Sequence, residues 1–391
     1  MRIVFAVHTY WPEGNGVQMV TQYLAEGLAV DNEVYVITEA SDATGEGLHN
    51  QVNIRRVCVE GPNAWNLFCG DKEKYIALLR ELSPDIFICV CTQSWQFDWL
   101  YGEIDKLPGK KILYTHGFSG LRPYAGVSHK GLARLIRVVR HNLLWEHYYK
   151  KHEKTIRGFD AVIHLAATSE SIKYVSQQNI PNNIIVGNAV EDIFFDMPVC
   201  EKEENFEEIR PLRYVCVSNY TALKNQIEII KAFYDAEDMS GELILIGSEE
   251  TEYYHQLVNT KDALDVKKGP RKVSFKVGMS RQEISRCLSE CDIFISTSLV
   301  EACSVVLLEA AAKGLAIVST NVGNASLIPG VIVVNHVREL PYMMNDLHDD
   351  PQLRQHCGRT LRHYAEQNAM VSGKIAQLEN IMSQLLDETK K

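Results

Sequence analysis

Short apolar runs alternate with longer amphipathic stretches along almost the whole chain. Runs rich in Val and Ile, such as Arg2–Val7, predict buried strands, whereas Val17–Val30 and Lys72–Leu82 have the spacing of amphipathic helices. Many predicted strands are apolar at consecutive positions, as expected when helices cover both faces of a parallel sheet. The predicted strands are Arg2–Val7, Glu33–Thr38, Ile54–Val59, Asp85–Cys91, Lys111–His116, Ala161–Leu165, Ile184–Gly187, Arg213–Ser218, Glu242–Gly247, Val273–Gly278, Asp292–Thr297, Leu315–Thr320 and Val331–Val334.

The length of the chain and one acidic segment predict two domains. A chain of 391 residues is too long for one ordinary core. The segment MPVCEKEENFEEIRP is acidic, flanked by prolines and weakly periodic, which is typical of a linker. We therefore expect a first domain at 1–197, a linker at 198–211, a second domain at 212–370, and a helix at 371–391 that can return to the first domain.

Composition and charge narrow the function classes. A net charge of −10 argues against a general nucleic-acid binder. The start MRIVFAVHTYWPEG predicts a buried strand rather than a signal peptide, and no apolar stretch approaches the roughly 20 residues of a membrane span. Ten cysteines are scattered, and the pairs Cys89/Cys91 and Cys287/Cys291 lack a second pair at zinc-site spacing. We expect buried thiols, no metal and a cytoplasmic protein.

Two carboxylates flank the predicted start of a helix in the second domain. Glu301 lies in the loop after strand Asp292–Thr297, Ser304 is at the predicted N-cap, Glu309 lies in the second turn, and Gly314 ends the helix. The free N–H groups of a first helical turn suit a diphosphate, and carboxylates accept hydrogen bonds from vicinal hydroxyls. Spacing alone leaves open an ordinary capped helix with one exposed Glu.

The same segment, EACSVVLLEAAAKGLAIVSTNVG, resembles the E-x7-E motif of the family 4 retaining glycosyltransferases. Earlier in the chain, the segments VYVIT, THG, VGNAVEDIFF and VSNYTALKNQIEIIKAF resemble further family segments and occur in the family order. The resemblance covers nearly the whole chain. It implies an α/β fold of the GT-B type, with an acceptor-binding and a nucleotide-sugar-binding Rossmann-like domain facing across a cleft. It also implies that Glu301 contacts the donor sugar, that Glu309 holds the ribose diol, and that the backbone at Cys303, Ser304 and Val305 binds sugar hydroxyls and phosphate. The family usually has Gly at the Ser304 position.

Lys224 is the candidate cation for the predicted phosphate site. Lys224, in SNYTALKNQ, resembles the Lys that neutralises the donor diphosphate. Ser218 and Asn219 stand where the family usually has a Gly-Arg pair, so a second cation is missing there. No D-x-D triplet occurs, which agrees with a reaction that needs no metal cofactor. A solvated Lys at a helix start is the structural alternative, although a cation there is mildly unfavourable.

Two further candidates lie in the first domain. His116 ends a predicted strand in YTHGFSG, and the family often has a His there near the reaction centre. Gly16, in Gly14–Asn15–Gly16, matches the second position of the family's glycine loop near the donor phosphates. A purely structural His and a plain turn remain the alternatives.

A basic stretch stands out in this acidic chain. Residues 122–157 contain nine Lys or Arg and two Glu, and the apolar residues Leu132, Leu135, Ile136, Val139 and Leu143 supply one side of a helix. The pattern indicates a helix lying on an anionic membrane or binding an anionic acceptor. A solvated face on a core-packed helix is the alternative.

Together these features favour a retaining hexosyltransferase. It would move a sugar from a UDP-sugar, or a GDP-sugar, to a hydroxyl of a glycan or lipid-linked acceptor in cell-surface polysaccharide synthesis. Two alternatives remain, a GT-B-type sugar-nucleotide epimerase and a non-catalytic sugar-nucleotide-binding protein. We expect a cytoplasmic protein associated with the cytoplasmic face of a membrane.

Overall fold

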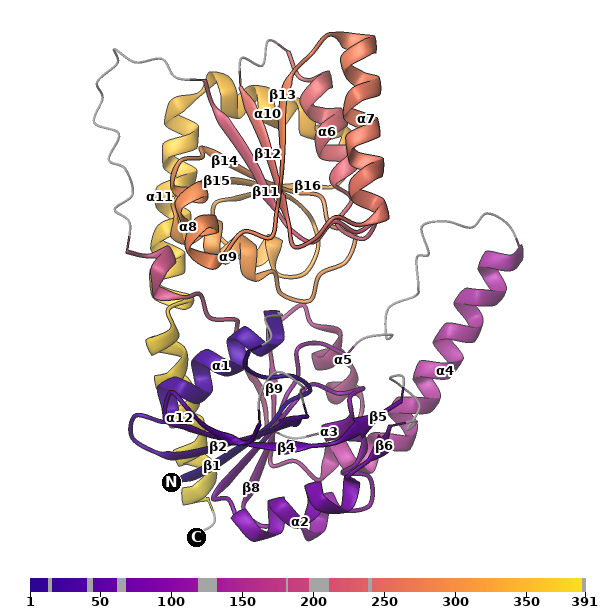
Figure 1. The fold of residues 1–391 in the computed structure, drawn as a ribbon, viewed down its shortest axis with the longest axis vertical. Helices are drawn as coiled ribbons and strands as arrows, with labels where there is room; N and C mark the ends of the chain where they lie inside the picture. The colour runs from indigo at the N-terminus through magenta and orange to yellow at the C-terminus, as the bar shows by residue number, and fades with distance from the viewer. Residues whose placement is uncertain are drawn as a thin grey trace. The chain divides into compact units, whose positions relative to one another are not determined.

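The computed structural model describes the chain apart from residues 13–15, 41–44, 62–67, 119–131, 181, 197–210, 238–240 and 389–391, and apart from the side chains of 132–135 and 137. The chain forms two compact units (Figure 1). Unit 1 consists of Met1–Ala189 and Val371–Lys391, and unit 2 of Val190–Met370. The expected linker 198–211 lies outside the described residues except for Pro211.

Unit 1 is built on a mostly parallel sheet with the order β10-β9-β8-β7-β1-β2-β4-β3 in the described residues. Only the β3–β4 pair of this sheet is antiparallel, and β5 and β6 form a separate two-stranded ribbon. The chain order reverses at β1, which lies between β2 and β7. The strands are β1 (Arg2–Ala6), β2 (Glu33–Glu39), β3 (Gly47–His49), β4 (Val52–Val57), β5 (Val59–Glu60), β6 (Cys69–Gly70), β7 (Ile86–Val90), β8 (Lys110–Tyr114), β9 (Ala161–His164) and β10 (Asn183–Ile185).

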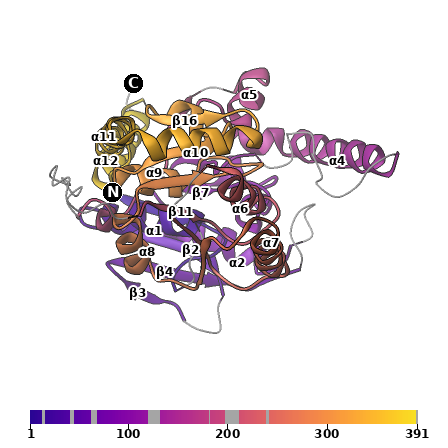
Figure 2. The ribbon, with the colours of Figure 1, turned by 90° about the horizontal axis from the view of Figure 1, so that it is seen from above.

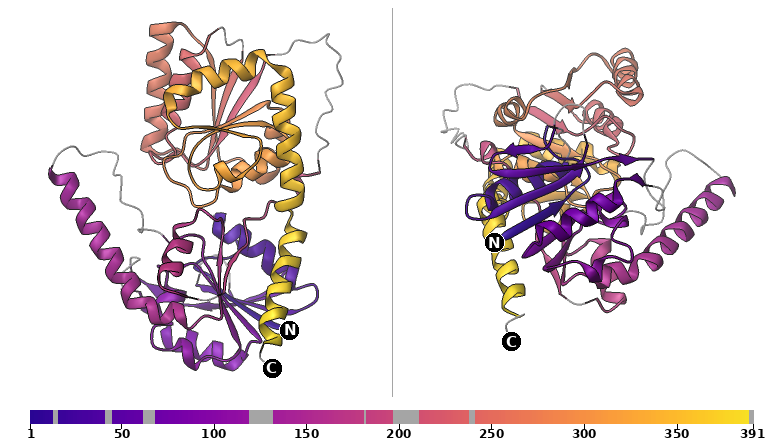
Figure 3. Two further views of the ribbon diagram at one scale, coloured as in Figure 1. Left: turned by 180° about the vertical axis from the view of Figure 1, so that it is seen from behind. Right: turned by 60° about the horizontal axis from the view of Figure 1, so that its bottom comes forward.

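Helices cover both faces of this sheet. One core cluster joins side chains of β1, β7, β8 and β9 to α2, α3, α5 and the second half of α4. Helix α12 packs against α1 (Figure 3), so the C-terminal segment belongs to unit 1. The helices of unit 1 are α1 (Gly16–Leu28), α2 (Lys72–Leu82), α3 (Trp95–Asp98), η1 (Ile104–Lys106), α4 (Leu132–Arg157), α5 (Glu170–Gln177) and α12 (Val371–Asp387).

Unit 2 contains a second parallel sheet, with the order β13-β12-β11-β14-β15-β16 in the described residues. Here the chain order reverses at β11, which lies between β12 and β14. Its strands are β11 (Arg213–Val217), β12 (Glu242–Gly247), β13 (Lys272–Val277), β14 (Ile293–Ser296), β15 (Ala316–Thr320) and β16 (Val331–Val334). Its helices are η2 (Asp192–Phe194), α6 (Gln226–Asp235), α7 (Glu252–Lys268), α8 (Arg281–Ser289), α9 (Val305–Ala312), η3 (Ala325–Leu327), η4 (Val337–Glu339), α10 (Leu340–Asp349) and α11 (Pro351–Asn368).

The short segment before the undescribed linker belongs to unit 2, whereas we expected the first domain to continue to residue 197. Phe194 lies in the apolar core of unit 2. The carbonyl of Ile193 accepts hydrogen bonds from Ser285 Oγ at 2.8 Å and from Lys313 Nζ at 3.1 Å. These tertiary contacts, which no local pattern encodes, place η2 with the second unit.

The α/β fold class with two Rossmann-like units is confirmed, and each predicted strand is present with ends that differ by at most a few residues. The short strands β3, β5 and β6 were not predicted. Since both sheets are mainly parallel and doubly wound, a ligand site is expected at the carboxyl ends of the strands where the chain order reverses. This rule directs attention to the ends of β11 and β14 in unit 2, and of β1 and β7 in unit 1.

Cysteine burial differs in part from expectation. Cys58 and Cys69 are exposed, whereas Cys89 and Cys216 lie in strands and are buried. All cysteines among the described residues are free. Burial raises the pKa of Cys216 to about 11, which keeps this thiol protonated and unreactive.

Candidate active site

The loops after β11 and β14 are tied together at the carboxyl edge of the unit 2 sheet. Leu299 N–H donates to the carbonyl of Leu223 at 2.8 Å. Thr297 Oγ1 donates to the carbonyls of Lys224 and Asn225, at 3.2 and 2.9 Å. These bonds fix the backbone that carries Lys224 against the backbone that carries Glu301.

Lys224 and Glu301, 77 positions apart in sequence, form a partly buried ion pair. Lys224 Nζ lies 2.5 Å from Glu301 Oε1, and the side chains are 27% and 15% exposed. Ser298 Oγ donates to the same carboxylate oxygen at 2.7 Å. Partial burial strengthens such a pair relative to one in water, and it leaves both groups within reach of a ligand.

Gly323 allows this loop to approach the end of β15. Its φ is +59°, and a Cβ atom built there would lie 2.9 Å from Glu301 Cβ and 3.2 Å from the carbonyl of Ala302. A side chain at this position would therefore displace the Glu301 loop. Glycine at position 323 is therefore required for steric reasons.

The turn at Ser304 differs from the predicted cap. Ser304 is at the N-cap of α9, but its side chain makes no capping hydrogen bond. Its backbone N–H donates instead to Asn324 Oδ1 at 2.9 Å, and Ser304 is buried. Cys303 and Val305, on either side, are partly exposed. Asn324 therefore holds the turn, and the helix ends as expected, with Gly314 at φ +69°.

Glu309 is fully buried and paired with an arginine that the sequence analysis missed. Arg281, the first residue of α8, lies 2.5 Å from Glu309 Oε1 and 2.7 Å from Glu191 Oε1. The guanidinium also stacks on the Phe194 ring, 4.7 Å from its centroid. Burial raises the pKa of Glu309, and the charge of Arg281 opposes this rise.

The second oxygen of this carboxylate, Glu309 Oε2, is buried and has no hydrogen-bond partner among the described residues. A buried acceptor without a partner costs roughly 1–3 kcal/mol, so it favours a ligand that donates there. Because Glu309 has no exposed surface, neighbouring side chains must move for a ligand to reach it. An Arg in the first turn of a helix opposes the helix dipole, and this signal could have identified Arg281.

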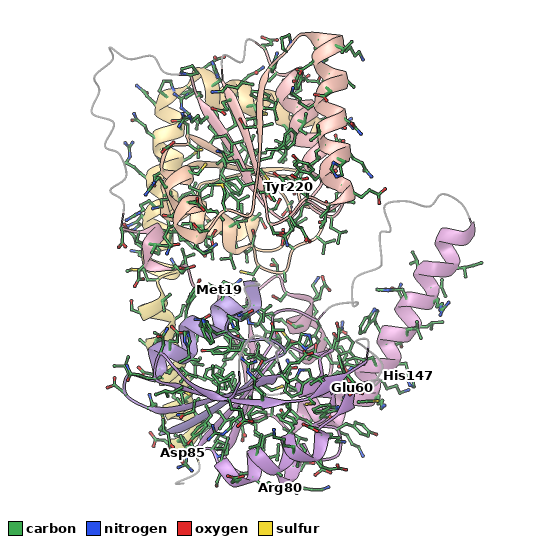
Figure 4. The ribbon with its side chains drawn as sticks, in the orientation of Figure 1. Met19, Glu60, Arg80, Asp85, His147 and Tyr220 are labelled. Carbon is green, nitrogen blue, oxygen red and sulfur yellow. The ribbon has the colours of Figure 1, made fainter. Side chains whose placement is uncertain are left out.

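The turn after β11 is held by neutral groups. Gln226 Nε2 donates to Ser218 Oγ at 2.7 Å and to the carbonyl of Asn219 at 3.0 Å. Tyr220 anchors the same turn, because its hydroxyl bonds the carbonyls of Leu245 and Lys276 at 2.7 and 3.0 Å (Figure 4). Gln226, which follows Lys224 by two positions, therefore holds Ser218 and Asn219 beside the loop that carries Lys224.

His116 and Gly16 belong to unit 1, whereas the residues described above belong to unit 2. His116 comes two residues after β8, its ring lies 5.0 Å from that of Tyr114, and its buried Nε2 has no partner among the described residues. Burial lowers its pKa to about 4, so the ring is neutral at pH 7. Gly16 is the first residue of α1 and a Cβ there would meet nothing within 4 Å; Gly14 and Asn15 lie outside the described residues.

Residues 201–363 match the family model for glycosyl transferases group 1. Among solved structures, the sucrose-phosphate synthase of Thermosynechococcus elongatus is 12% identical, with a TM-score of 0.72 and 99% of each chain covered. HepE of Anabaena, solved with UDP, is 15% identical, with a TM-score of 0.71 and coverage of 98% of this chain and 100% of that one. WaaG, a glycosyltransferase involved in lipopolysaccharide biosynthesis, is 19% identical, with a TM-score of 0.64 and coverage of 98% and 99%. No curated protein matches this chain in sequence.

Proposed function

We propose that this protein is a retaining hexosyltransferase, because residues 201–363 match the family model for glycosyl transferases group 1 and the chain has the GT-B fold. It takes a nucleoside-diphosphate sugar, UDP-linked in preference to GDP-linked, and transfers the sugar to a hydroxyl of a glycan or lipid-linked acceptor. HepE has been solved with UDP and with UDP-glucose, which supports a UDP-sugar as the donor.

The ion pair of Lys224 and Glu301 carries this proposal. An ammonium group at the carboxyl edge of a parallel sheet suits a diphosphate, and a carboxylate beside it suits sugar hydroxyls. In the structure each group satisfies the other at 2.5 Å. Donor binding would exchange this contact for two, Lys224 with the diphosphate and Glu301 with the sugar hydroxyls, so neither group is left without a polar partner.

In the proposed reaction the bond between the anomeric carbon and the diphosphate oxygen breaks, while the acceptor oxygen bonds to the same face of the carbon. The leaving diphosphate accepts the hydroxyl proton, so no group on the protein is consumed. Negative charge develops on the diphosphate, and Lys224 with the N–H groups at the start of α9 stabilises it. Neutral His116 would contact the sugar as a hydrogen-bonding group, and no metal cofactor is required.

Glu309 would hold the ribose diol. Its Oε2 supplies the acceptor, while Arg281 keeps the carboxylate ionised and oriented through Oε1. Ribose hydroxyls are donors, and an ionised carboxylate accepts from two of them. Arg281 is then the residue that positions Glu309, in addition to the role that the E-x7-E motif implies for Glu309 itself.

Thermal unfolding with UDP, GDP, UDP-glucose and GDP-mannose tests the donor class. A ligand at one hundred times its Kd adds about 2.7 kcal/mol to the free energy of unfolding. We expect a shift with UDP compounds that is lost in Lys224→Ala and kept in Lys231→Ala, which removes an exposed Lys of α6. Absence of any shift with all four nucleotides would contradict a sugar-nucleotide site.

Product analysis separates the remaining alternatives. Transfer with retained anomeric configuration, followed by NMR of the product, supports the proposed enzyme. A free epimer of the sugar would indicate an epimerase. Donor binding without turnover, unchanged in Glu301→Gln, would indicate a non-catalytic binding protein.

We also propose that α4 binds an anionic membrane surface. Its first half extends from the rest of unit 1 (Figures 2 and 3), and Ile136, Val139 and Leu143 are 60%, 48% and 61% exposed, which contradicts core packing of this side. Arg140 and Lys150 on the same helix are exposed; Arg122 and Lys130 lie outside the described residues. No described helix is long and apolar enough to cross a membrane.

Co-sedimentation with phosphatidylglycerol vesicles tests this proposal. The fraction of protein bound to the vesicles should be smaller for the double variant Ile136→Ser/Leu143→Ser than for the unchanged chain. Absence of binding by the unchanged chain at low salt would contradict the proposal.

A further inference from the structure

Unit 2 contains a pocket of about 260 Å³ that is lined by residues of α8 and of the strands β11, β12 and β13. From α8 come Glu283, Arg286 and Cys287, whose spacing of three and four positions places them on one face of the helix. Arg213 at the start of β11 and Lys276 near the end of β13 also line the pocket. The described residues that line it include none of the candidate active site.

Two free thiols lie at the end of α8, a partly exposed one at Cys287 in the pocket and a buried one at Cys291. The helical turn continues past the end of α8, since Glu290 N–H donates to the carbonyl of Cys287 at 3.2 Å and Cys291 N–H to that of Leu288 at 3.1 Å. Residues four apart in a helix have Cα atoms about 6 Å apart, within the range of about 4.4–6.8 Å that a disulfide spans. A disulfide between the two thiols therefore requires only a small movement of this last turn.

The surroundings of Cys287 favour its thiolate. The Cys291 thiol, which hydrogen-bonds Cys287, lowers the pKa of Cys287, and the charges of Lys276 and Arg213 lower it further, whereas burial and the charge of Glu290 oppose this. The same hydrogen bond and burial raise the pKa of Cys291. Because the thiolate is the nucleophile in thiol–disulfide exchange, Cys287 is the sulfur that attacks first and Cys291 the thiol that follows.

The carboxylates that line the pocket are already bound to other groups of the protein. Glu283 Oε2 accepts hydrogen bonds from the N–H and from Oγ of Ser280, both at 2.7 Å. Arg213 pairs with Glu290 at 2.8 Å and with Glu242 at 3.8 Å. These contacts leave the other two cations of the lining to interact with a ligand.

These two cations, Lys276 and Arg286, are exposed beside the Cys287 thiol. Lys276 acts on the Cys287 sulfur through its charge, and Arg286 precedes Cys287 on α8. Exposed cations attract carboxylates and raise their local concentration. A small molecule that carries both a disulfide and carboxylates therefore matches the thiol and the charges of this pocket.

We propose that Cys287 is a modification site for small disulfides that carry carboxylates, and that Cys291 resolves the adduct. The thiolate of Cys287 bonds to one sulfur of the small disulfide, its S–S bond breaks, and the other half leaves and takes up the proton that Cys287 lost. The sulfur of Cys291 then bonds to that of Cys287, the bond between Cys287 and the adduct breaks, and the proton of Cys291 goes to the departing thiolate. Two protein thiols are oxidised to one disulfide, and the small disulfide is reduced to two thiols. Neither step involves the candidate active site, so this site is independent of the proposed glycosyltransferase function.

Three small disulfides of different charge test the site on the full chain: glutathione disulfide, which carries carboxylates, hydroxyethyl disulfide, which is neutral, and cystamine, which is cationic. Peptide mass mapping after timed quenching gives the rate of reaction at Cys287. In Lys276→Gln/Arg286→Gln we expect the rate with glutathione disulfide to fall about three- to ten-fold, the rate with hydroxyethyl disulfide to change little, and the rate with cystamine to rise. Comparing the same reagent on two chains cancels the intrinsic reactivity of each disulfide. Lys231→Gln/Lys267→Gln removes two exposed charges outside the pocket and should leave all three rates unchanged.

Cysteine variants assign the two sulfurs. Cys291→Ser should stop the reaction at the mixed disulfide of Cys287, whereas the unchanged chain should proceed to the disulfide between Cys287 and Cys291. Cys287→Ser should leave Cys291 unmodified. If either variant fails to fold, the charge variants still test the site with both thiols present. A rate with glutathione disulfide that is the same with and without the two cations, or a glutathione adduct that persists in the unchanged chain, would overturn the proposal.

Discussion

The carboxyl edge of the unit 2 sheet carries two ion pairs, Lys224 with Glu301 and Arg281 with Glu309, whereas a pocket at the corresponding edge of unit 1 is lined by amides, hydroxyls and apolar groups. Both edges lie where a parallel sheet reverses its strand order. Since both units share a doubly wound architecture, the difference in chemistry comes from the residues in the loops and helix starts at these edges. The unit 2 edge therefore carries fixed charges, whereas the described lining of the unit 1 pocket has no Asp, Glu, Lys or Arg.

The largest expected effect on the unit 2 edge is that of replacing Arg281. Arg281→Leu should lower the free energy of unfolding by about 3–5 kcal/mol, because it leaves Glu309 buried without its counter-charge. An unpaired buried carboxyl has a pKa raised above its unfolded value, so the folded chain binds a proton and the destabilisation grows as pH rises. Urea unfolding at pH 5 and pH 8 measures this. Arg286→Leu, an exposed Arg of α8, is the control, and Glu309→Gln in the Arg281→Leu background should restore part of the stability.

Lys224 tests the charge itself. Lys224→Ala should reduce kcat by about 10²–10³-fold, the usual effect of removing one group that stabilises developing charge. Steady-state kinetics with the donor found by thermal shift give the value. An equal loss in Lys231→Ala would show that the effect is not specific to this site.

Gly323 tests how closely the Glu301 loop is positioned. Gly323→Ala adds a Cβ that meets Glu301 Cβ at 2.9 Å, in a backbone region unfavourable for Ala. We expect a loss of about 1–3 kcal/mol in the free energy of unfolding together with weaker donor binding. Gly269→Ala, also at positive φ but with open space around it, carries the backbone strain without the contact. Equal effects of both changes on donor binding would show that the contact with Glu301 is unimportant.

The smallest expected effect concerns His116, which follows β8 in unit 1. His116 has a pKa of about 4 when folded and about 6.5 when unfolded, so the unfolded chain binds more protons between these values. The stability from this group is present above pH 6.5 and is lost as pH falls towards 4. His116→Gln should make the decline of Tm over pH 6.5 to 4 shallower, as differential scanning calorimetry would show. An unchanged slope would mean that His116 is not held neutral by burial.

The strands and the E-x7-E segment were predictable because their signals are local. Continuous apolar runs specify buried strands such as β11 and β14, and the loop–helix order around Glu301 and Ser304 follows from turn and capping preferences. Lys224 was predicted from its motif, although its pairing with Glu301 was not. The sequence therefore determined the elements, their parallel arrangement and the residue types at the unit 2 edge.

Tertiary structure alone decided which side chains meet. Arg281 reaches Glu309 and Glu191 across 28 and 90 positions, and Asn324 Oδ1 accepts from the backbone N–H of Ser304, 20 positions away. A pocket in unit 1 likewise joins residues after β1 to residues after β7, and Tyr148 and Tyr149 of α4 accept hydrogen bonds from Gln93 in its lining. Such contacts form only when segments that are distant in the sequence pack together. Their free energy depends on burial and on charge pairing in the folded chain, so a short stretch of sequence does not reveal them.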